Sequence, residues 1–392
     1  MYGWSMTTLT AAPIGELTDE QRDFVAAIRD FCEREVGTRE QRDALTANGR
    51  KPHNVELSKR VGELGWLGIG LPEEYGGTPG GVVDMCLLLE ETGRGQLPIG
   101  GYGVSRIIAA ATMKFGTDEQ KAQILGNIAS GGQEAIAMSE PGSGSDVASL
   151  QCRAVRDGDE YVINGQKTWI SEAHYADNIL LVCRTDDSGA KHDGISMIFV
   201  PKDTPGMEIR PIETMGGEVV NDVFFSDCRV PVENLLGTEN QGWVQLTAGL
   251  NIERLILAAM MLGVAQRAFD DLLGYVKERE QFGRPIGSFQ ALRHRIADLA
   301  TELECCRLLT YDVARRVDQN PDAMFPREAS MAKLKVTETA KKISLEGMQM
   351  MGGYGYATEY DMERHVRTTL VSTIYGGTSE IQREIISKTL GL

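Results

Sequence analysis

The sequence has no excess of positive charge. Its 392 residues include 40 lysines and arginines against 56 aspartates and glutamates, which gives a net charge of -16. This balance disfavours a nucleic acid or an anionic membrane surface as the main partner. No apolar run reaches about 18 residues, the length that crosses a membrane. We therefore expect no nucleic-acid and no membrane partner, and any anionic ligand must be held by a local group of donors.

Cysteine and histidine are scarce and scattered. The seven cysteines include no C-x-x-C pair, and the five histidines never fall at metal-ligand spacing. The first residues lack a basic region followed by a long apolar run. We therefore expect free thiols, no metal site and a cytoplasmic location. The sequence also lacks G-x-G-x-x-G between a strand and a helix, and G-x-x-x-x-G-K-[ST], which disfavours a nicotinamide Rossmann domain and a P-loop.

The order of helical and strand patterns divides the chain into three parts. Helical periodicity comes first, with Thr18 as the expected N-cap of the first helix. Short runs rich in Val, Ile, Tyr and Phe follow, and long helical patterns then return. At about 150 residues per domain, the length allows two to three domains. We predict a helical domain over 1–130, a β domain over 131–239 and a helical bundle over 240–392.

Two segments near the β region have features of a binding site. AMSEPGSGSD (137–146) combines small residues and hydroxyls, which let backbone N–H groups approach a planar, electron-rich ligand. NGQKTWIS (164–171) places Trp169 and Ser171 on the same side of a strand, because side chains alternate. Considered alone, the first segment is equally compatible with a solvated turn, and Trp169 with an ordinary core position.

Two further segments lie among the helices of the last third. REQFGRPIGSFQ (279–290) joins two helices and offers a fork-shaped guanidinium suited to a diphosphate. QMMGGYGY (349–356) allows a close backbone approach after a helix. Either one alone is compatible with a simple interhelical turn. The occurrence of all four segments in one chain, in this order, is a much stronger signal than any one of them.

With these segments the sequence resembles the acyl-CoA dehydrogenase family from about Leu17 to Leu390. The resemblance rests on AMSEPGSGSDVAS, REQFGRPIGSFQ, QMMGGYGYATEYDMERHVR and IYGGTSEIQREII. It implies an α+β multidomain fold with an N-terminal helical domain, a central β domain and a C-terminal four-helix bundle. It also implies an acyl-CoA substrate, FAD bound across a subunit interface, a homotetramer, and electron-transferring flavoprotein as the electron acceptor.

The resemblance also implies which residues contact the ligands. The flavin ring is expected to meet Met138, Ser139, Trp169, Ile170 and Ser171. The diphosphate and adenosine of FAD in a neighbouring subunit are expected to meet Arg279, Gln281, Phe282 and Gln290. The same half of FAD is expected to meet Gln349, Gly352 and Gly353, with Thr378 and Glu380 close by. Ser145 is assigned to the cofactor site and to the pantetheine arm of the substrate.

The usual catalytic base of the family is absent. Dehydrogenation of an acyl thioester needs a carboxylate that removes the α-proton while hydride leaves Cβ for the flavin. Most family members place it before the Gly-Thr of the last motif (I-Y-E-G-T), where this chain has Gly376. Glu253 lies on an apolar helical stripe, which is typical either of a buried salt bridge or of a functional acid. The isovaleryl-CoA and long-chain branches carry their base in this helix, in a similar E-R-L pattern, which implies Glu253 as the base.

The remaining substrate contacts follow from the same resemblance. The N–H at Gly376 is expected to hold the thioester oxygen together with a ribityl hydroxyl of FAD, with Gly377 beside it. Asn251 and Arg254 are expected to contact the CoA arm, although many members have an acid at position 251. Two other classes stay open: a flavin-dependent oxidase or monooxygenase on the same fold, and a non-catalytic subunit that binds CoA or FAD.

Overall fold

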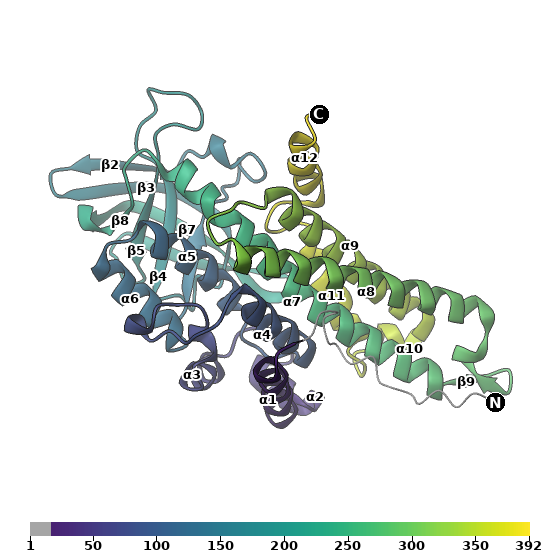
Figure 1. The fold of residues 1–392 in the computed structure, drawn as a ribbon. Helices are drawn as coiled ribbons and strands as arrows, with labels where there is room; N and C mark the ends of the chain where they lie inside the picture. Colours follow the sequence, from purple (N-terminus) through teal and green to yellow (C-terminus); the bar gives the residue numbers. More distant parts are fainter. Residues whose placement is uncertain (1–16) are drawn as a thin grey trace.

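The computed structural model describes residues 17–392, apart from the side chains of residues 248–251. Figure 1 shows helices at the N-terminus, a sheet in the middle and long helices at the C-terminus. The N-terminal region contains α1 (Asp19–Val36), α2 (Arg39–Thr46), α3 (Val55–Glu63), α4 (Val82–Gly95), α5 (Gly101–Phe115) and α6 (Asp118–Ala129).

The first helix begins at the predicted cap. The Thr18 hydroxyl accepts a hydrogen bond from the Gln21 N–H at 3.2 Å, and the Gln21 side chain accepts from the Thr18 N–H at 3.2 Å. This reciprocal capping box satisfies two backbone donors that a helix start leaves unpaired. The buried face of α1 includes Val25, Ile28 and Phe31 and packs against α4. The cap and the apolar stripe predicted from the sequence are confirmed.

The middle region is one mixed sheet. Its strands are β1 (Glu134–Ala137), β2 (Arg153–Asp157), β3 (Glu160–Ser171), β4 (Asn178–Arg184), β5 (Ile195–Pro201), β6 (Met207–Thr214), β7 (Gly217–Pro231) and β8 (Leu235–Leu236). Their order is β6-β7-β3-β2-β4-β5-β8, and β1 pairs with β4 in parallel.

The strand β4 joins the sheet to the helices. Ile179 and Leu181 pack in the core of the β region, whereas Leu180 and Val182 belong to the helical core. Since both faces are buried, β4 has a continuous apolar sequence rather than an alternating one. The sheet and the helices therefore share one packed boundary.

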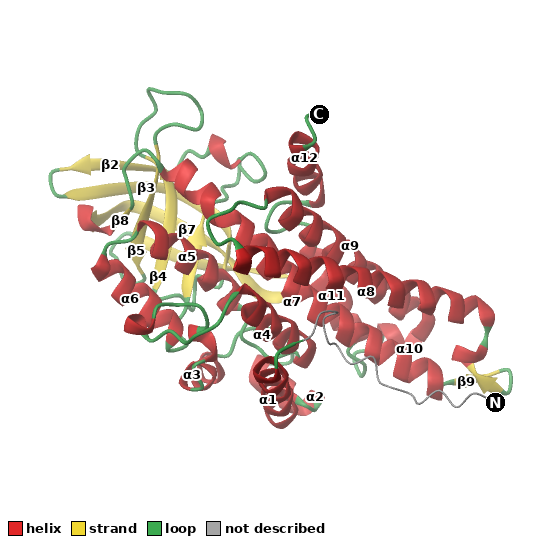
Figure 2. Cartoon of the chain, viewed as in Figure 1, coloured by secondary structure: helices red, strands yellow, loops and turns green. Residues whose placement is uncertain are grey.

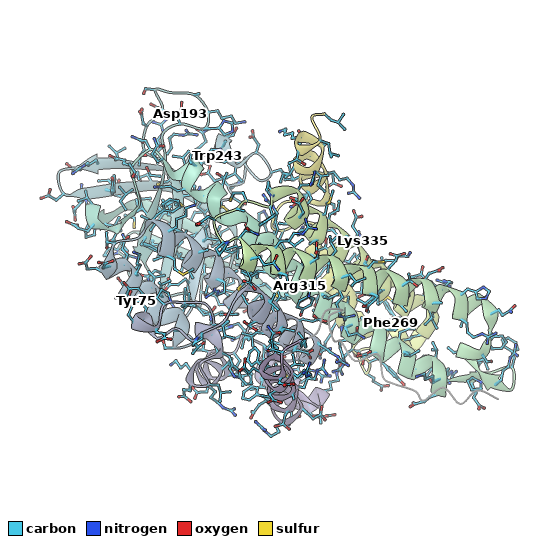
Figure 3. The ribbon with its side chains drawn as sticks, in the orientation of Figure 1. Tyr75, Asp193, Trp243, Phe269, Arg315 and Lys335 are labelled. Atoms are coloured by element: carbon cyan, nitrogen blue, oxygen red, sulfur yellow. The ribbon has the colours of Figure 1, made fainter. Side chains whose placement is uncertain are left out.

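The C-terminal region is built around one long helix. It contains α7 (Gly242–Glu278), α8 (Gln290–Gln319), α9 (Pro326–Met351), α10 (Gly353–Tyr356), α11 (Met362–Ser372) and α12 (Ser379–Thr389). Helices α7, α8, α9 and α11 pack as a bundle, and Phe269 of α7, labelled in Figure 3, is 1% exposed. By length and composition α7 could cross a membrane, but 79% of its apolar window is buried inside the protein, as in a core helix.

The two ends of α7 lie in different surroundings. Its start adjoins the sheet, and the hairpin of β9 (Glu280–Gln281) and β10 (Arg284–Pro285) follows its end. Figure 2 shows the large sheet in yellow at the left and this small hairpin at the far right. The predicted domain boundaries after residues 130 and 239 fall in the connections before β1 and before α7.

Candidate active site

The first two predicted segments lie side by side at one edge of the sheet. The Thr168 N–H of β3 donates to the Ser139 carbonyl at 2.9 Å, just beyond the end of β1. Lys167 stabilises the contact between the two segments. Its buried Nζ donates to the Met138 carbonyl at 2.9 Å and to Glu140 Oε1 at 2.8 Å. The Lys167–Glu140 pair is a structural element that sequence reasoning missed.

The ring of Trp169, at the end of β3, is exposed to solvent. Trp169 is 59% exposed and Ser171 is half-buried, whereas Ile170 is 2% exposed. A bulge between Lys167 and Ile170 and a φ of +61° at Trp169 produce this orientation. An ordinary core position for Trp169 is therefore excluded. Ile170 packs in the β core, so only its backbone is available for the predicted contact with FAD.

The glycine-rich loop after β1 is open. A methyl group placed on Gly142 or Gly144 would have no neighbour within 4 Å among the described atoms. Ser143 is buried and its hydroxyl donates to the Asp146 carbonyl at 2.5 Å, which fixes the turn. Ser145 is exposed between these residues. The loop thus leaves room for a ligand beside Ser145.

A carboxylate and a glycine turn meet at the start of α7. Glu253 is 7% exposed, and Gly376 lies in the turn between α11 and α12 with a φ of +59°. A methyl group placed on Gly376 would lie 3.6 Å from Glu253 Oε1 and only 2.2 Å from Leu257 Cδ1. No side chain fits at position 376 unless Leu257 moves. The carboxylate at this point therefore comes from α7.

The environment of Glu253 raises its pKa towards neutral pH. Burial raises the pKa of Glu253 to about 7, against the opposing effect of the charges of Arg254 and Lys333. Arg254 and Lys333 are thus the described cations whose charges act on this carboxylate. The buried salt bridge and the functional acid both stay compatible with its position. Arg254 is half-buried next in the helix, and the side chain of Asn251 lies outside the described residues.

Two buried polar side chains that sequence reasoning missed hold the glycine turn. Lys333 Nζ of α9 donates to the carbonyls of Ser372 at 3.0 Å and Gly377 at 2.8 Å. Gln382 Nε2 of α12 donates to the carbonyls of Gly376 and Gly377, both at 3.0 Å. Each is 0% exposed. The sequence does carry a signal for both residues, because each is a polar residue on the apolar face of a helix. The same criterion identified Glu253.

The third predicted segment forms a cavity at the far end of the bundle. The hairpin tip places Phe282 and Gly283 at φ of +54° and +75°, as a tight two-residue turn requires, and leaves Phe282 94% exposed. Arg279 and Phe282 line a cavity of about 980 Å³. Other residues lining it are Tyr275, Gln281, Phe289, Gly352, Gly353 and Tyr354.

The chemistry of this cavity fits one half of FAD. The Arg279 guanidinium lies 5.2 Å from the centre of the Tyr354 ring, so a cation and aromatic faces are close together. A methyl group on Gly352 or Gly353 would meet no described atom within 4 Å, so the backbone there is open to a ligand. An arginine fork suits a diphosphate and aromatic rings suit an adenine. Gln290 and Gln349 flank the cavity without lining it.

Within a single chain Thr378 and Glu380 lie away from Gly352, so their expected contact with an FAD bound between two copies stays a prediction. They adjoin Gly377, which contacts Lys333, and Lys333 precedes Gly352 by 19 helical positions, about 28 Å at 1.5 Å per residue. Thr378 and Glu380 therefore belong to the end of the molecule that contains Glu253.

Comparisons with known proteins agree with this arrangement. Models of the acyl-CoA dehydrogenase N-terminal, middle and C-terminal domains match residues 18–132, 135–228 and 240–391. The "Probable acyl-CoA dehydrogenase YngJ" of Bacillus subtilis is 38% identical over 96% of this chain and 99% of its own length. The "Caffeyl-CoA reductase-Etf complex subunit CarC" of Acetobacterium woodii is 37% identical over 95% of this chain and 98% of its own length.

A solved structure extends the similarity to three dimensions. The acyl-CoA dehydrogenase from Geobacillus kaustophilus superposes with a TM-score of 0.90 and 35% identity, over 97% of this chain and 100% of that chain. The three domains and their order thus agree with those of the family. The chain belongs to the acyl-CoA dehydrogenase family, whose members are FAD-dependent oxidoreductases.

Proposed function

We propose that the protein converts an acyl-CoA thioester to the trans-2-enoyl-CoA, with Glu253 removing the α-proton. The observation that carries this proposal is the placement of the Glu253 carboxylate against Gly376, at the position where most of the family has a glutamate. The function itself follows the family, whose relatives support acyl-CoA dehydrogenation.

The residues of this chain account for the proton half of the reaction. Glu253 has a pKa of about 7, raised by burial, so its ionised form is a strong enough base to take a weakly acidic proton near neutral pH. Charge then develops on the thioester oxygen. The Gly376 N–H donates to no described residue and is free to donate to that oxygen. When bound, FAD supplies the acceptor for the hydride that leaves Cβ.

The cofactor would be held by two copies of the chain. Met138 and Ser139 follow β1, and Trp169 and Ser171 end β3, in the sheet whose β5 contacts α7. Arg279 follows the end of α7. Arg279 lies 26 positions beyond Glu253, about 39 Å along the helix axis, too far for one FAD to bridge within one chain. If a neighbouring copy placed its Arg279 cavity beside this sheet, one FAD could contact both sets of residues. This supports a homo-oligomer, for which the resemblance implies a tetramer.

The reduced FAD would pass its electrons to another flavoprotein. The resemblance implies electron-transferring flavoprotein, and the name of the related CarC subunit describes it as part of a reductase–Etf complex. The competing candidate, an oxidase on the same fold, would pass electrons to dioxygen instead.

The test is anaerobic reduction of the bound flavin, followed as bleaching of its visible absorbance. Purified holoprotein is mixed with straight, branched and cyclic acyl-CoAs, alongside Glu253→Gln. We expect bleaching by at least one thioester, slow reoxidation in air, and a rate at least a hundredfold lower in the variant with its FAD retained. Fast reoxidation would favour the oxidase. Absence of bleaching by every thioester would contradict the proposed function.

A further inference from the structure

Lys333 of α9 is a buried cation that forms no ion pair with the described residues. It is 0% exposed, as is Lys167, but Lys167 is neutralised by Glu140 at 2.8 Å. Among the described residues no carboxylate lies within 4.0 Å of Lys333 Nζ. An ammonium group is costly to bury unless other groups compensate for its lost hydration. Its partners therefore indicate what the residue does.

These partners all belong to the glycine turn. Lys333 Nζ donates to the carbonyl of Ser372, the last residue of α11, and to that of Gly377, just before α12. It also lies 5.9 Å from the centre of the Tyr375 ring, within range of a cation–π contact. One side chain thus joins both ends of the turn that contains Gly376.

The turn has a conformation that needs such support. Gly376 and Gly377 both adopt left-handed φ, +59° and +79°, and glycine loses the most conformational freedom on ordering. Lys333 and Gln382 occupy the two glycine carbonyls from the buried side. The Gly376 N–H is left without a partner among the described residues.

We propose that Lys333 is a positioning residue of the active site, which fixes the turn so that the Gly376 N–H and the Glu253 carboxylate keep one relative placement. The proposal rests on the proposed function of those two groups. Lys333 acts through the turn and contacts no reacting atom.

The charge of Lys333 gives this role a distinctive signature. Among the described residues, Arg254 of α7 and Lys333 of α9 are the cations that lower the pKa of Glu253. Glu253, Glu338 and Glu380 in turn raise the pKa of Lys333, but burial lowers it to about 8. Loss of the ammonium should therefore raise the pKa of Glu253. A residue that only supports packing would not have this effect.

The variant Lys333→Met removes the donors and the charge while keeping the length of the side chain. We expect flavin reduction by saturating acyl-CoA to slow about ten- to a hundredfold, because the turn loses its placement. We also expect the acid limb of the rate–pH profile to move up by about one pH unit.

Two variants serve as matched controls. Lys335, labelled in Figure 3, lies two positions further along α9 and pairs with Glu302 at 3.1 Å. Lys335→Met should leave both readouts unchanged. Gln382→Met removes the other support of the turn without removing a charge, so it should lower the rate and leave the acid limb in place.

The outcomes separate the two proposals. If folded, flavin-loaded Lys333→Met keeps the wild-type rate and acid limb, or loses only thermal stability, the positioning role is wrong. If it does not accumulate as folded protein, Lys333→Gln, which keeps donors but no charge, is measured instead: its acid limb should still move up, and an unmoved acid limb would contradict the proposal. If no acyl-CoA reduces the wild-type flavin, the proposed function itself fails, whatever the variants do.

Discussion

At one end of α7 the Glu253 carboxylate is buried against a turn that two side chains hold in place. At the other end Arg279 and Phe282 face an open cavity, and Phe282 is 94% exposed on a tight hairpin. The closed end has the parts of a proton-transfer site within one chain. The open end combines a cation, aromatic rings and glycine backbone around a cavity. Among the described residues, nothing lies within 4 Å of a methyl group placed on Gly352 or Gly353. The difference suggests that the open end completes the site of another copy.

Mixing two inactive variants tests this comparison most severely. Glu253→Gln lacks the base and Arg279→Ala lacks the arginine of the cavity, so each alone should show little flavin reduction. Differently tagged chains expressed together should regain between about a quarter and a half of wild-type activity, because each mixed pair contains one intact site of two. Activity is measured on the doubly tagged fraction. Mixed oligomers without any activity would mean that both groups act within one chain.

The pH dependence tests the closed end alone. The pKa of Glu253 is raised to about 7, and only the ionised carboxylate can accept a proton. The rate of flavin reduction should therefore fall about tenfold for each pH unit well below 7 and level off above it. Stopped-flow rates are measured together with flavin content, so that loss of FAD is separated from loss of the base. A rate that stays level down to about pH 5 would contradict the raised pKa.

The smallest expected effect concerns the fit of the glycine turn. Gly376→Ala places a methyl group 2.2 Å from Leu257 Cδ1 at a φ of +59°, so we expect a loss of about 1–3 kcal/mol in stability. Gly274→Ala is the matched control on α7, since a methyl group there meets no described atom within 4 Å. It should keep or slightly raise the stability, because alanine favours a helix. Equal unfolding temperatures in both variants would contradict the close packing of Leu257 against Gly376.

The sequence predicted local elements and one long-range match. The Thr18 cap follows from capping chemistry, and the strand at 164–171 from its residue types. The glycine at 376 and the acid at 253 lie 123 positions apart, and they could be paired because the family resemblance links the two departures.

Other features could not be predicted because their partners are backbone groups. Lys333 and Gln382 bind carbonyls of the turn, and sequence patterns show only that each residue lies on a buried helix face. The resemblance likewise assigns Thr378 and Glu380 to the cofactor without telling at which end of the bundle they lie within one chain.

The central claim is that the Glu253 carboxylate removes the α-proton beside Gly376. Its most direct test is deuterium uptake at Cα, in D₂O, of a bound acyl-CoA whose β-carbon is replaced by sulfur, so that no hydride can leave. Mass spectrometry compares the wild type with Glu253→Gln and with Glu338→Gln, a surface control that pairs with Arg383. We predict uptake in the wild type and in the control, and at least a hundredfold less in Glu253→Gln. Uptake at the wild-type rate in Glu253→Gln would contradict the account.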